Sequence, residues 1–397
     1  MRSLTISTVR ITQRTVMRVT QLENLANEWA PSLHFLVPVA SRPKFDEIAR
    51  MTSGGLSNIT VALPTEIKTM RSRMGAIPMI RLDKPEELQP GDVVAVNPAH
   101  HSLQVLLRES DTHHALFLTN RCNNNCMMCS QPPTRQDDSW LLEEALSAIR
   151  HVRHAPARLG LTGGEPLLYG EDLRKVFDAV AEYLPGTQIE LLTNGRQLSD
   201  PAVSASLLNG LRTPISWFVP LYGHADFLHD FVVQMHGAFD ETLSGLLCLQ
   251  AYRQPIQLRV VLIEPVLKVL PQLCAFIGRN FPFVRELALM GCEPVGFALA
   301  NRTQCEVNLT HWASTLEHSV HLLDQHAIPV LLMNIPHCAL PKALWSRATQ
   351  SISDWKQTYA HECATCAQKK HCCGLFSWHK KSWGSAPIAS IKEEIAS

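Results

Sequence analysis

Short apolar runs separated by turn residues dominate the first part of the chain, up to about residue 111. Leu4, Ile6 and Ile11 alternate with polar residues and predict a strand near the start. Further strands are predicted at 34–39, 59–63, 77–82, 92–96 and 102–107, the last two forming a pair. The pattern therefore predicts a small β-rich domain over residues 1–111, whose role the sequence does not indicate.

From residue 112 the pattern changes to a repeat of strand, loop and helix. Strands are predicted at 116–118, 159–162, 188–192, 215–221, 256–263 and 286–290. Helices with one apolar face are predicted at 139–149, 171–183 and 239–252. This repeat predicts an α/β fold, a parallel partial (β/α)6 TIM-like barrel over 112–305, followed by a cysteine-rich extension over 306–397. In such barrels the loops at the carboxyl ends of the strands build the active site.

Three cysteines follow the first strand of this repeat. Cys122, Cys126 and Cys129 have C-x3-C-x2-C spacing on one short loop. Three thiolates can bind three irons of a [4Fe-4S] cluster and leave the fourth iron open. Structural zinc prefers four closed ligands, usually as two separated pairs, so zinc is the weaker alternative. Incidental free thiols are the remaining one.

The next predicted strand ends in Gly163-Gly164-Glu165-Pro166. Adjacent glycines let the main chain approach a ligand closely, and the Glu165 carboxylate can accept hydrogen bonds from an ammonium group. The motif alone is a weak signal, since Gly-Gly and Glu-Pro occur in many turns. Its place one strand-helix unit after the cysteine loop makes it informative.

These two motifs, in this order, resemble those of the radical SAM superfamily. The resemblance implies that Cys122, Cys126 and Cys129 ligate three irons and that S-adenosylmethionine (SAM) binds the fourth. Met128 occupies the position that packs near the adenine, where most members have an aromatic residue; an ordinary packing role is the alternative. Gly163, Gly164 and Glu165 would lie against the methionyl amino group of SAM.

Two further positions are assigned toward the cofactor. Thr193 and Asn194, at the end of the third strand, could reach the ribose or adenine, or belong to an ordinary Asn-Gly turn. Arg259 lies within an apolar strand, where a cation needs a partner. We expect Arg259 to point into the barrel and pair with the SAM carboxylate. The alternative is an internal salt bridge with Glu264 or Glu286.

Composition narrows the class of protein. The 397 residues contain 36 Lys+Arg and 36 Asp+Glu, which gives no polybasic signature of nucleic-acid or membrane binding. No apolar run approaches the length of a membrane span, and no secretory signal precedes the 12 cysteines. We therefore expect a cytoplasmic protein with free thiols. Residues 1–21 lack acidic residues, as transit peptides do, but the alternation of apolar and polar residues there favours a strand.

A second group of cysteines lies near the carboxyl terminus. Cys363, Cys366 and Cys372 have C-x2-C-x5-C spacing, and Cys338 can supply a fourth thiolate. We expect a second [4Fe-4S] cluster here, with zinc and unmetallated thiols as alternatives. Cys373 directly follows Cys372 and is the alternative fourth ligand.

Five segments narrow the resemblance to the HxsC branch of the His-Xaa-Ser system radical SAM maturases. They are MCSQPP at 128–133, MGCEPVGFA at 290–298, NIPHCALP at 334–341, SISDWK at 351–356 and the terminal cysteine block. Members of that branch end in Cys-Gly-Gly-Phe-Phe, whereas this chain has Cys372-Cys373-Gly374-Leu375-Phe376. The departure leaves open which thiol ligates, and spacing favours Cys372.

The narrower resemblance implies a peptide maturase that cleaves SAM reductively to a 5′-deoxyadenosyl radical. Its partners would be a ribosomally made precursor peptide with His-Xaa-Ser repeats, a sister radical SAM maturase, and a one-electron reductant such as flavodoxin or ferredoxin. One alternative is a radical SAM enzyme that acts on a small molecule or activates another enzyme. A non-enzymatic zinc-binding interaction protein is the remote alternative.

Other chemistry-bearing residues receive structural interpretations. The pairs His100-His101 and His113-His114 are expected at the surface or in turns, because no third ligand accompanies them. His229 and Asp230 are expected to belong to the start of a helix. The remaining cysteines are expected to be buried, unmodified thiols without close partners, namely Cys248, Cys274, Cys292 and Cys305.

Overall fold

The computed structural model describes residues 2–66, 77–380, 383 and 388–392. The chain forms two compact units. The first comprises residues 1–117, 139–160 and 175–188, and the second comprises 118–138, 161–174 and 189–397.

The first unit contains a closed barrel with strand order β1-β5-β4-β3-β2-β6-β7. Its strands are β1 (Arg2–Val9), β2 (Thr15–Val19), β3 (Phe35–Pro38), β4 (Ile59–Pro64), β5 (Met79–Leu82), β6 (Val93–Asn97) and β7 (Ser102–Leu107). The expected β-rich character is confirmed, as is the antiparallel pairing of β6 with β7. Closure was not predicted, because it requires β1 to pair with both β5 and β7, which lie far along the chain.

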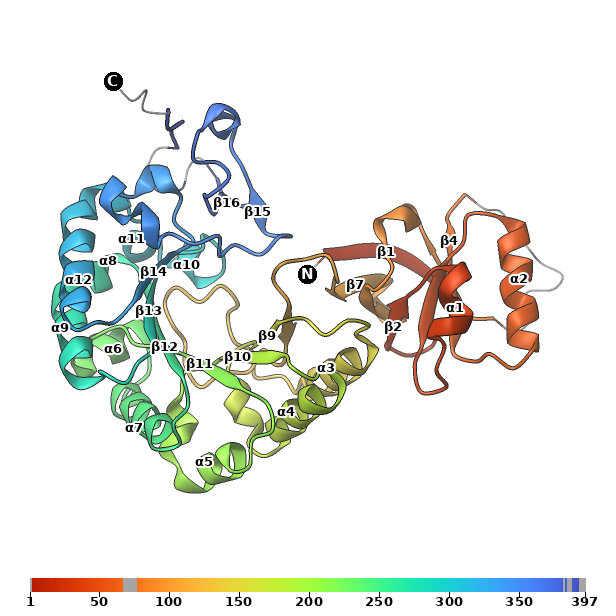
Figure 1. The fold of residues 1–397 in the computed structure, drawn as a ribbon, viewed down its shortest axis with the longest axis horizontal. Coiled ribbons are helices and arrows are strands. Elements are labelled where there is room, and N and C mark those ends of the chain that lie inside the picture. Colours follow the sequence, from red (N-terminus) through yellow and green to blue (C-terminus); the bar gives the residue numbers. More distant parts are fainter. Residues whose placement is uncertain (1, 67–76, 381–382, 384–387, 393–397) are drawn as a thin grey trace. The chain divides into compact units, whose positions relative to one another are not determined.

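Two apolar layers explain the alternation along these strands. In β3, Leu36 packs inside the barrel with residues such as Met17 and Leu103. Its neighbours Phe35 and Val37 point the other way and pack with residues of α1 (Leu22–Glu28) and α2 (Arg42–Ser53). Both helices lie beside the barrel in Figure 1. These two helices and β2 were not predicted.

Within the same unit, helix α3 (Trp140–His151) is attached to the barrel by a buried arginine. Arg18 of β2 donates from Nε to the carbonyl oxygen of His151 at 2.6 Å and from Nη2 to that of Val152 at 3.1 Å. The His151 ring accepts a hydrogen bond from the main-chain N–H of His34 at Nε2, at 3.0 Å. Its Nδ1 lies 2.8 Å from the Ser147 carbonyl oxygen and donates to it. Burial lowers the pKa of His151 to about 4, so the ring is neutral at pH 7.

The other large sheet of the fold is open and has seven strands, in the order β14-β13-β12-β11-β10-β9-β8. Its strands are β8 (Ala115–Phe117), β9 (Arg158–Thr162), β10 (Gln188–Leu192), β11 (Ile215–Pro220), β12 (Ile256–Leu262), β13 (Glu286–Gly291) and β14 (Val330–Met333). Pairing from β10 to β14 is parallel, as expected. The expected number of six strands was wrong, because β14 is only four residues long and gives a weak sequence signal.

Helices cover the outer side of this sheet, including α5, α7, α9 and α12 (Figure 1). The helices after α3 are α4 (Asp172–Tyr183), α5 (Pro201–Leu208), α6 (Asp226–Val233), α7 (Ala238–Ala251), α8 (Glu264–Leu267), α9 (Leu270–Asn280), α10 (Phe297–Ala300), α11 (Arg302–Cys305) and α12 (Ala313–Gln325). Along β12, Leu258, Val260 and Leu262 are fully buried, while Arg259 and Val261 remain half-buried on the opposite face. That inner face is therefore free to take part in a site.

The carboxyl-terminal segment, residues 342–376, contains only 3-10 helices and two-residue strands. A two-stranded sheet joins β15 (Gln357–Thr358) to β16 (Leu375–Phe376), over a small core of Ile352, Cys373 and Phe376. The same segment runs along the outer edge of β14, where the Thr349 N–H donates to the Leu332 carbonyl oxygen at 2.9 Å. The segment therefore covers the outer edge of β14, the last strand of the sheet.

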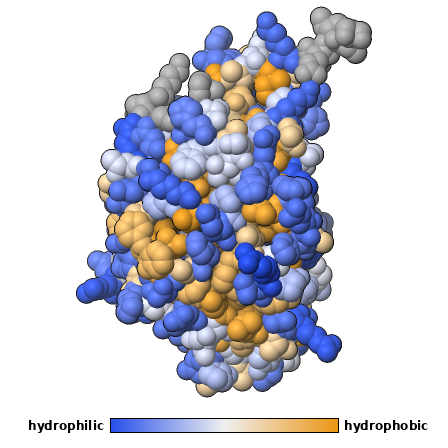
Figure 2. Space-filling model, turned by 90° about the vertical axis from the view of Figure 1, so that its left-hand side faces the viewer, coloured by the Kyte–Doolittle hydropathy of each residue, from blue (hydrophilic) through white to orange (hydrophobic). Residues whose placement is uncertain are grey.

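On the face seen in Figure 2, polar residues surround patches of hydrophobic residues. Large exposed hydrophobic side chains include Phe227 and Phe231, which lie one turn apart on α6. In the part of the chain that the structure describes, no helix is long and apolar enough to cross a membrane. As expected, His100, His101 and His113 are exposed.

The buried His151 predicts that stability falls in weak acid. Its folded-state pKa of about 4 lies below the value of 6.5 that is usual for histidine, so the unfolded chain binds the proton more tightly. Stability should therefore decrease as pH falls from about 6.5 toward 4, by up to about 3 kcal/mol from this group. Urea denaturation at several pH values measures the effect. A His151→Gln variant should lose part of this slope; an unchanged slope would contradict the assignment.

Candidate active site

The three cysteines of the C-x3-C-x2-C loop lie together after the end of β8. Cys122, Cys126 and Cys129 are free and half-buried. Burial raises the pKa of Cys122 to about 11, and it also raises those of Cys126 and Cys129. Proximity of the thiols adds to the increase for Cys122 and Cys126. Thiols in such a place ionise when a cationic group compensates their charge, as bound iron does.

The three thiols lie near one another but do not converge as ligands of a single ion. Among residues 2–66, 77–380 and the described remainder, no three His, Cys, Asp or Glu side chains converge closely enough to hold a single metal ion. In a [4Fe-4S] cluster each cysteine binds a different iron, so the ligands surround the group instead of meeting at one point. The Asn124 N–H already points at the Cys122 sulfur, at 3.4 Å. The loop therefore fits a cluster with one open iron.

A buried carboxylate holds the segment that leads into the loop. Asp138 is 5% exposed and accepts a hydrogen bond from the Thr119 hydroxyl at 2.9 Å. It also accepts from the side chain of Asn120 at 3.1 Å and from Nε of Arg121 at 3.2 Å. This role of Asp138 was not predicted, because nothing in the sequence signals these contacts with residues 119–121.

The two glycines of the GGEP motif are required by the approach of two main chains. The Gly164 N–H donates to the Thr119 carbonyl oxygen at 2.6 Å, and the Glu165 N–H donates to that of Arg121 at 2.8 Å. A Cβ atom on Gly164 would lie 2.2 Å from the Arg121 carbonyl oxygen, and one on Gly163 would lie 2.5 Å from that of Thr119. Close approach was expected toward a ligand; the structure shows it toward the cysteine loop itself.

Glu165 links this motif to the next strand end. Its side chain is fully buried, and Oε1 accepts from the Thr193 hydroxyl at 2.6 Å and from the Leu167 N–H at 2.9 Å. Oε2 accepts from the Asn194 N–H at 2.6 Å. Burial raises the pKa of Glu165 to about 6, although these donors act in the opposite direction. Three of the carboxylate's hydrogen-bond positions are thus occupied by the protein.

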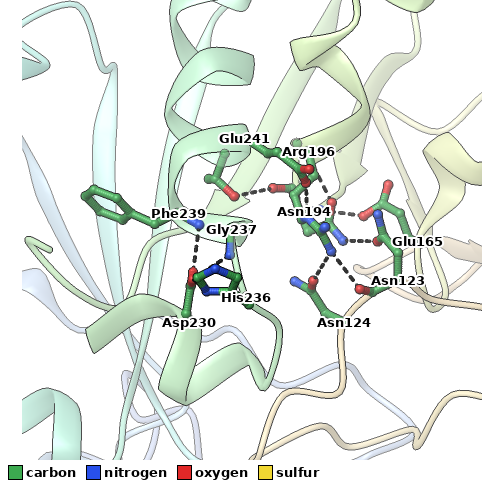
Figure 3. A network of polar contacts seen from close by, with 12 residues as sticks. Asn123, Asn124, Glu165, Asn194, Arg196, Asp230, His236, Gly237, Phe239 and Glu241 are labelled. Carbon is green, nitrogen blue, oxygen red and sulfur yellow. Dashed lines mark hydrogen bonds and ion pairs between the residues drawn. The ribbon is translucent and has the colours of Figure 1, made fainter. Parts of the chain in front are cut away.

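Arg196 completes the contact between these loops (Figure 3). Its Nη1 donates to the Asn123 carbonyl oxygen and to Oδ1 of Asn124, both at 2.6 Å, while Nε donates to Glu241 at 2.6 Å. Asn123 and Asn124 belong to the cysteine loop. The sequence analysis missed Arg196, although it directly follows the Thr-Asn-Gly motif.

The other residues assigned to the cofactor are hydrogen-bonded or buried within the protein, namely Thr193, Asn194 and Met128. Asn194 donates from Nδ2 to Oδ1 of Asn123 at 2.6 Å, and its Oδ1 accepts from the Arg196 N–H at 3.1 Å. The Thr193 hydroxyl is held by Glu165. Met128 is 7% exposed and packs beside the cysteines. Their roles toward the cofactor stay predictions.

Two segments from elsewhere in the chain close around the cysteine loop. The Asn125 and Met127 N–H groups donate to carbonyl oxygens at the end of α6, both at 3.0 Å. On another side, the Phe297 N–H donates to the Cys129 carbonyl oxygen at 2.8 Å, and Nδ2 of Asn301 donates to that of Met127 at 2.9 Å. The loop is therefore held mainly through its main chain, which leaves the thiols available.

Arg259 lies on the inner face of the sheet, as expected. Its guanidinium stacks on Phe218 at 4.1 Å, and Nε donates to Gln257 at 2.8 Å. Burial lowers its pKa to about 10, which still leaves it cationic at pH 7. The alternative salt bridges were not found: Glu264 pairs with Lys268, and Glu286 accepts from Gln257. Pairing of Arg259 with the SAM carboxylate stays a prediction.

A further residue, Tyr222 after β11, lies near these groups and was not predicted. It is 7% exposed, and burial together with the nearby Cys126 and Cys129 raises the pKa of its hydroxyl. Its ring stacks on His229 at 5.9 Å between centroids.

Asp230 accepts from the N–H groups of Gly237 and Phe239, which begin α7 (Figure 3). A structural role at the start of a helix was expected for Asp230. The structure shows that Asp230, which lies in α6, binds the start of the next helix, α7.

The second cysteine group forms a separate pocket. Cys338, Cys363, Cys366 and Cys372 all line it. Main-chain N–H groups point at the sulfurs: that of Gly374 lies 3.4 Å from Cys372, and that of Ile391 lies 3.4 Å from Cys366. Hydrogen bonds of this kind accompany thiolates that ligate iron–sulfur clusters. These residues therefore fit a second closed cluster.

Cys373 points away from this pocket. It is 2% exposed and packs with Ile352 and Phe376 in the small carboxyl-terminal core. Its thiol donates to the Gly374 carbonyl oxygen at 3.4 Å, and the proximity of Cys373 lowers the pKa of Cys372 to about 6. The expected preference for Cys372 over Cys373 has this geometric support, and the assignment of a ligand stays a prediction.

The other cysteines differ in part from expectation. Cys274 and Cys305 are buried, but Cys248 and Cys292 are only half-buried. Cys292 and Cys305 lie close enough to shift each other's pKa, so the expected absence of close partners was wrong for them. Cys292 precedes α10 in the chain, and Cys305 is the last residue of α11.

Arg196 and Glu241 offer a matched pair of substitutions. The Arg196 side chain is 9% exposed, whereas that of Glu241 is 46% exposed. Arg196→Leu leaves two buried oxygens of the cysteine loop without a donor and should cost about 2–4 kcal/mol in the free energy of unfolding. Glu241→Gln should cost less than about 1 kcal/mol. Chemical denaturation checks both; equal losses would contradict this account of the loop.

Comparison with known proteins agrees with this geometry. Residues 116–263 match the model of the Radical SAM superfamily. The chain is similar to a probable GTP 3′,8-cyclase of Methanocella arvoryzae, with 28% identity over 155 residues, which are 38% of this chain and 48% of that protein. The chain thus spans about half the length of this curated relative.

Two solved structures are similar in fold. SuiB of Streptococcus suis bound to S-adenosylmethionine has a TM-score of 0.44 at 14% identity, covering 58% of this chain and 52% of that chain. The protein anSMEcpe with bound AdoMet and a Cp18Cys peptide has a TM-score of 0.44 at 13% identity, covering 55% and 63%. The remote alternative, a non-enzymatic zinc-binding protein, is wrong, because the matched family is one of enzymes. Residues 116–263 of this chain are thus a radical SAM domain, the domain that radical SAM enzymes share.

Proposed function

We propose that this enzyme is a peptide maturase that modifies a ribosomally made precursor, one with His-Xaa-Ser repeats. The observation that carries the proposal is the convergence of four of the segments that resemble the His-Xaa-Ser maturases. They line one pocket through Gly291, Cys292 and Pro294, through Ile335 and Pro336, through Ile352, and through Leu375 and Phe376. Segments far apart in sequence that meet at one pocket support a shared functional role for the matching residues.

In this proposal the chain's own residues bind and orient the reactants. Cys122, Cys126 and Cys129 would hold a [4Fe-4S] cluster, and Arg259 would pair with the carboxylate of SAM. When bound, the cluster and SAM would supply the radical chemistry that removes a hydrogen atom from the substrate. Arg196 keeps the cysteine loop in place, while Tyr222 and Met128 exclude water beside it.

The second pocket would hold another [4Fe-4S] cluster through Cys338, Cys363, Cys366 and Cys372. Such a cluster supplies an electron-transfer centre. Its N–H donors would offset the negative charge of the thiolates. A one-electron reductant such as flavodoxin or ferredoxin would be the external partner, and a sister radical SAM maturase a second one. We expect the reaction to take place in the cytoplasm.

A small-molecule substrate is the second candidate, and one observation favours it. The relative from Methanocella arvoryzae is named as a probable GTP 3′,8-cyclase, and its likeness covers 155 residues. Incubation of the reconstituted protein with dithionite and SAM, and with either a His-Xaa-Ser peptide or GTP, separates the two. A mass change in the peptide supports the maturase; conversion of GTP alone contradicts it.

The cysteine loop should be essential for SAM cleavage. Cys126→Ala removes one of three ligands, so 5′-deoxyadenosine formation should fall to background after anaerobic reconstitution. Cys248→Ala, which changes a half-buried thiol outside both cysteine groups, should keep the activity. Chromatographic measurement of 5′-deoxyadenosine checks both variants. Retained cleavage in Cys126→Ala would refute the ligand assignment.

Iron content should identify the fourth ligand of the second site. The reconstituted protein should bind about eight irons per chain, and Cys372→Ala should bind about four. Cys373→Ala should retain about eight, because the Cys373 side chain is buried in the small carboxyl-terminal core. Iron and sulfide analysis provides the measurement. The opposite result would make Cys373 the ligand, and about four irons in the unmodified protein would remove the second cluster.

A further inference from the structure

The ring of one buried histidine, His337, has no hydrogen-bond partner in the part of the chain that the structure describes. His337 is 4% exposed and lies in a short 3-10 helix, His337–Ala339. Neither ring nitrogen has a partner among the described residues. A buried polar group without a partner costs about 1–3 kcal/mol, and folded proteins satisfy nearly all of them. This ring is therefore placed for a partner that the protein chain does not supply.

The ring is held firmly, so its lack of a partner is not the result of a loose side chain. His337 stacks on Trp345 with ring centroids 5.5 Å apart and an angle of 18° between the planes. Nε1 of Trp345 donates to the His337 carbonyl oxygen at 3.1 Å and to that of Leu340 at 3.2 Å. Trp345 thus fixes both the ring and the main chain of His337.

His337 lines the pocket formed by the four carboxyl-terminal cysteines. Its main-chain N–H donates to the Cys372 sulfur, and the Ala389 N–H donates to that of Cys338. The pocket therefore already directs several N–H donors at sulfur. An imidazole carries at least one N–H in either of its neutral tautomers and in its cation.

We propose that the His337 imidazole donates an N–H hydrogen bond to a sulfur of the cluster in this pocket and thereby raises its reduction potential. The inference rests on the proposed second cluster. A donor reduces the negative charge on the cluster's sulfurs, which favours the reduced state. Because four cysteines line the pocket and a closed cluster takes four ligands, the ring acts as a donor and not as a ligand.

The experiment compares His337→Phe with His337→Gln in the reconstituted full-length protein. Phenylalanine keeps the ring that stacks on Trp345 but removes the donor, whereas glutamine keeps an N–H donor. His361→Phe removes an exposed imidazole from the same cysteine segment and serves as the control. Redox titration followed by electron paramagnetic resonance measures the potentials of both clusters.

We expect His337→Phe to shift the potential of the second cluster to more negative values, with unchanged iron content and an unchanged first cluster. The potential of His337→Gln should lie closer to that of the unmodified protein, and the potential of His361→Phe should match it. An unchanged potential in His337→Phe, with about eight irons bound, would overturn this inference alone. Loss of about four irons in that variant would make His337 a ligand and overturn the donor role. About four irons in the unmodified protein would overturn the second cluster and the inference together.

Discussion

The buried carboxylate of Glu165 is the interaction on which the arrangement of the site depends. A fully buried charge is tolerated only when donors surround it, and Glu165 has donors from its own turn and from the end of β10. The same turn forms main-chain hydrogen bonds with residues 119 and 121. Three consecutive strand ends are thus held together before any cofactor contributes. This preorganisation keeps the cysteine loop close to its functional geometry.

Local pattern predicted much of the fold and the position of the site. Each strand of the α/β repeat up to β13 was predicted within a few residues, because buried parallel strands are short, apolar and bounded by turn residues. The cysteine loop and the GGEP turn were found from spacing alone. Their location at strand ends follows from the parallel topology, which the alternation of strands and helices already implies.

The parts that were not predicted depend on contacts between distant residues. Asp138 and Arg196 look like ordinary charged residues in sequence, yet each is buried against main-chain or side-chain groups of the cysteine loop. The closure of the first barrel and the seventh strand of the sheet also depend on long-range pairing. Sequence periodicity reports which face of an element is buried; it does not report which distant group that face meets.

The pairing of residues 348–351 with the edge of β14 has a consequence for metal-depleted protein. Residues 342–376 contain only two-residue strands and 3-10 helices, so few main-chain hydrogen bonds hold them in place. A group bound by Cys338, Cys363, Cys366 and Cys372 would act as a staple for this segment. Without the staple, the segment can detach and uncover the hydrogen-bonding edge of β14. An uncovered edge strand pairs readily with other chains, so iron starvation would yield aggregated protein before it yielded inactive soluble protein.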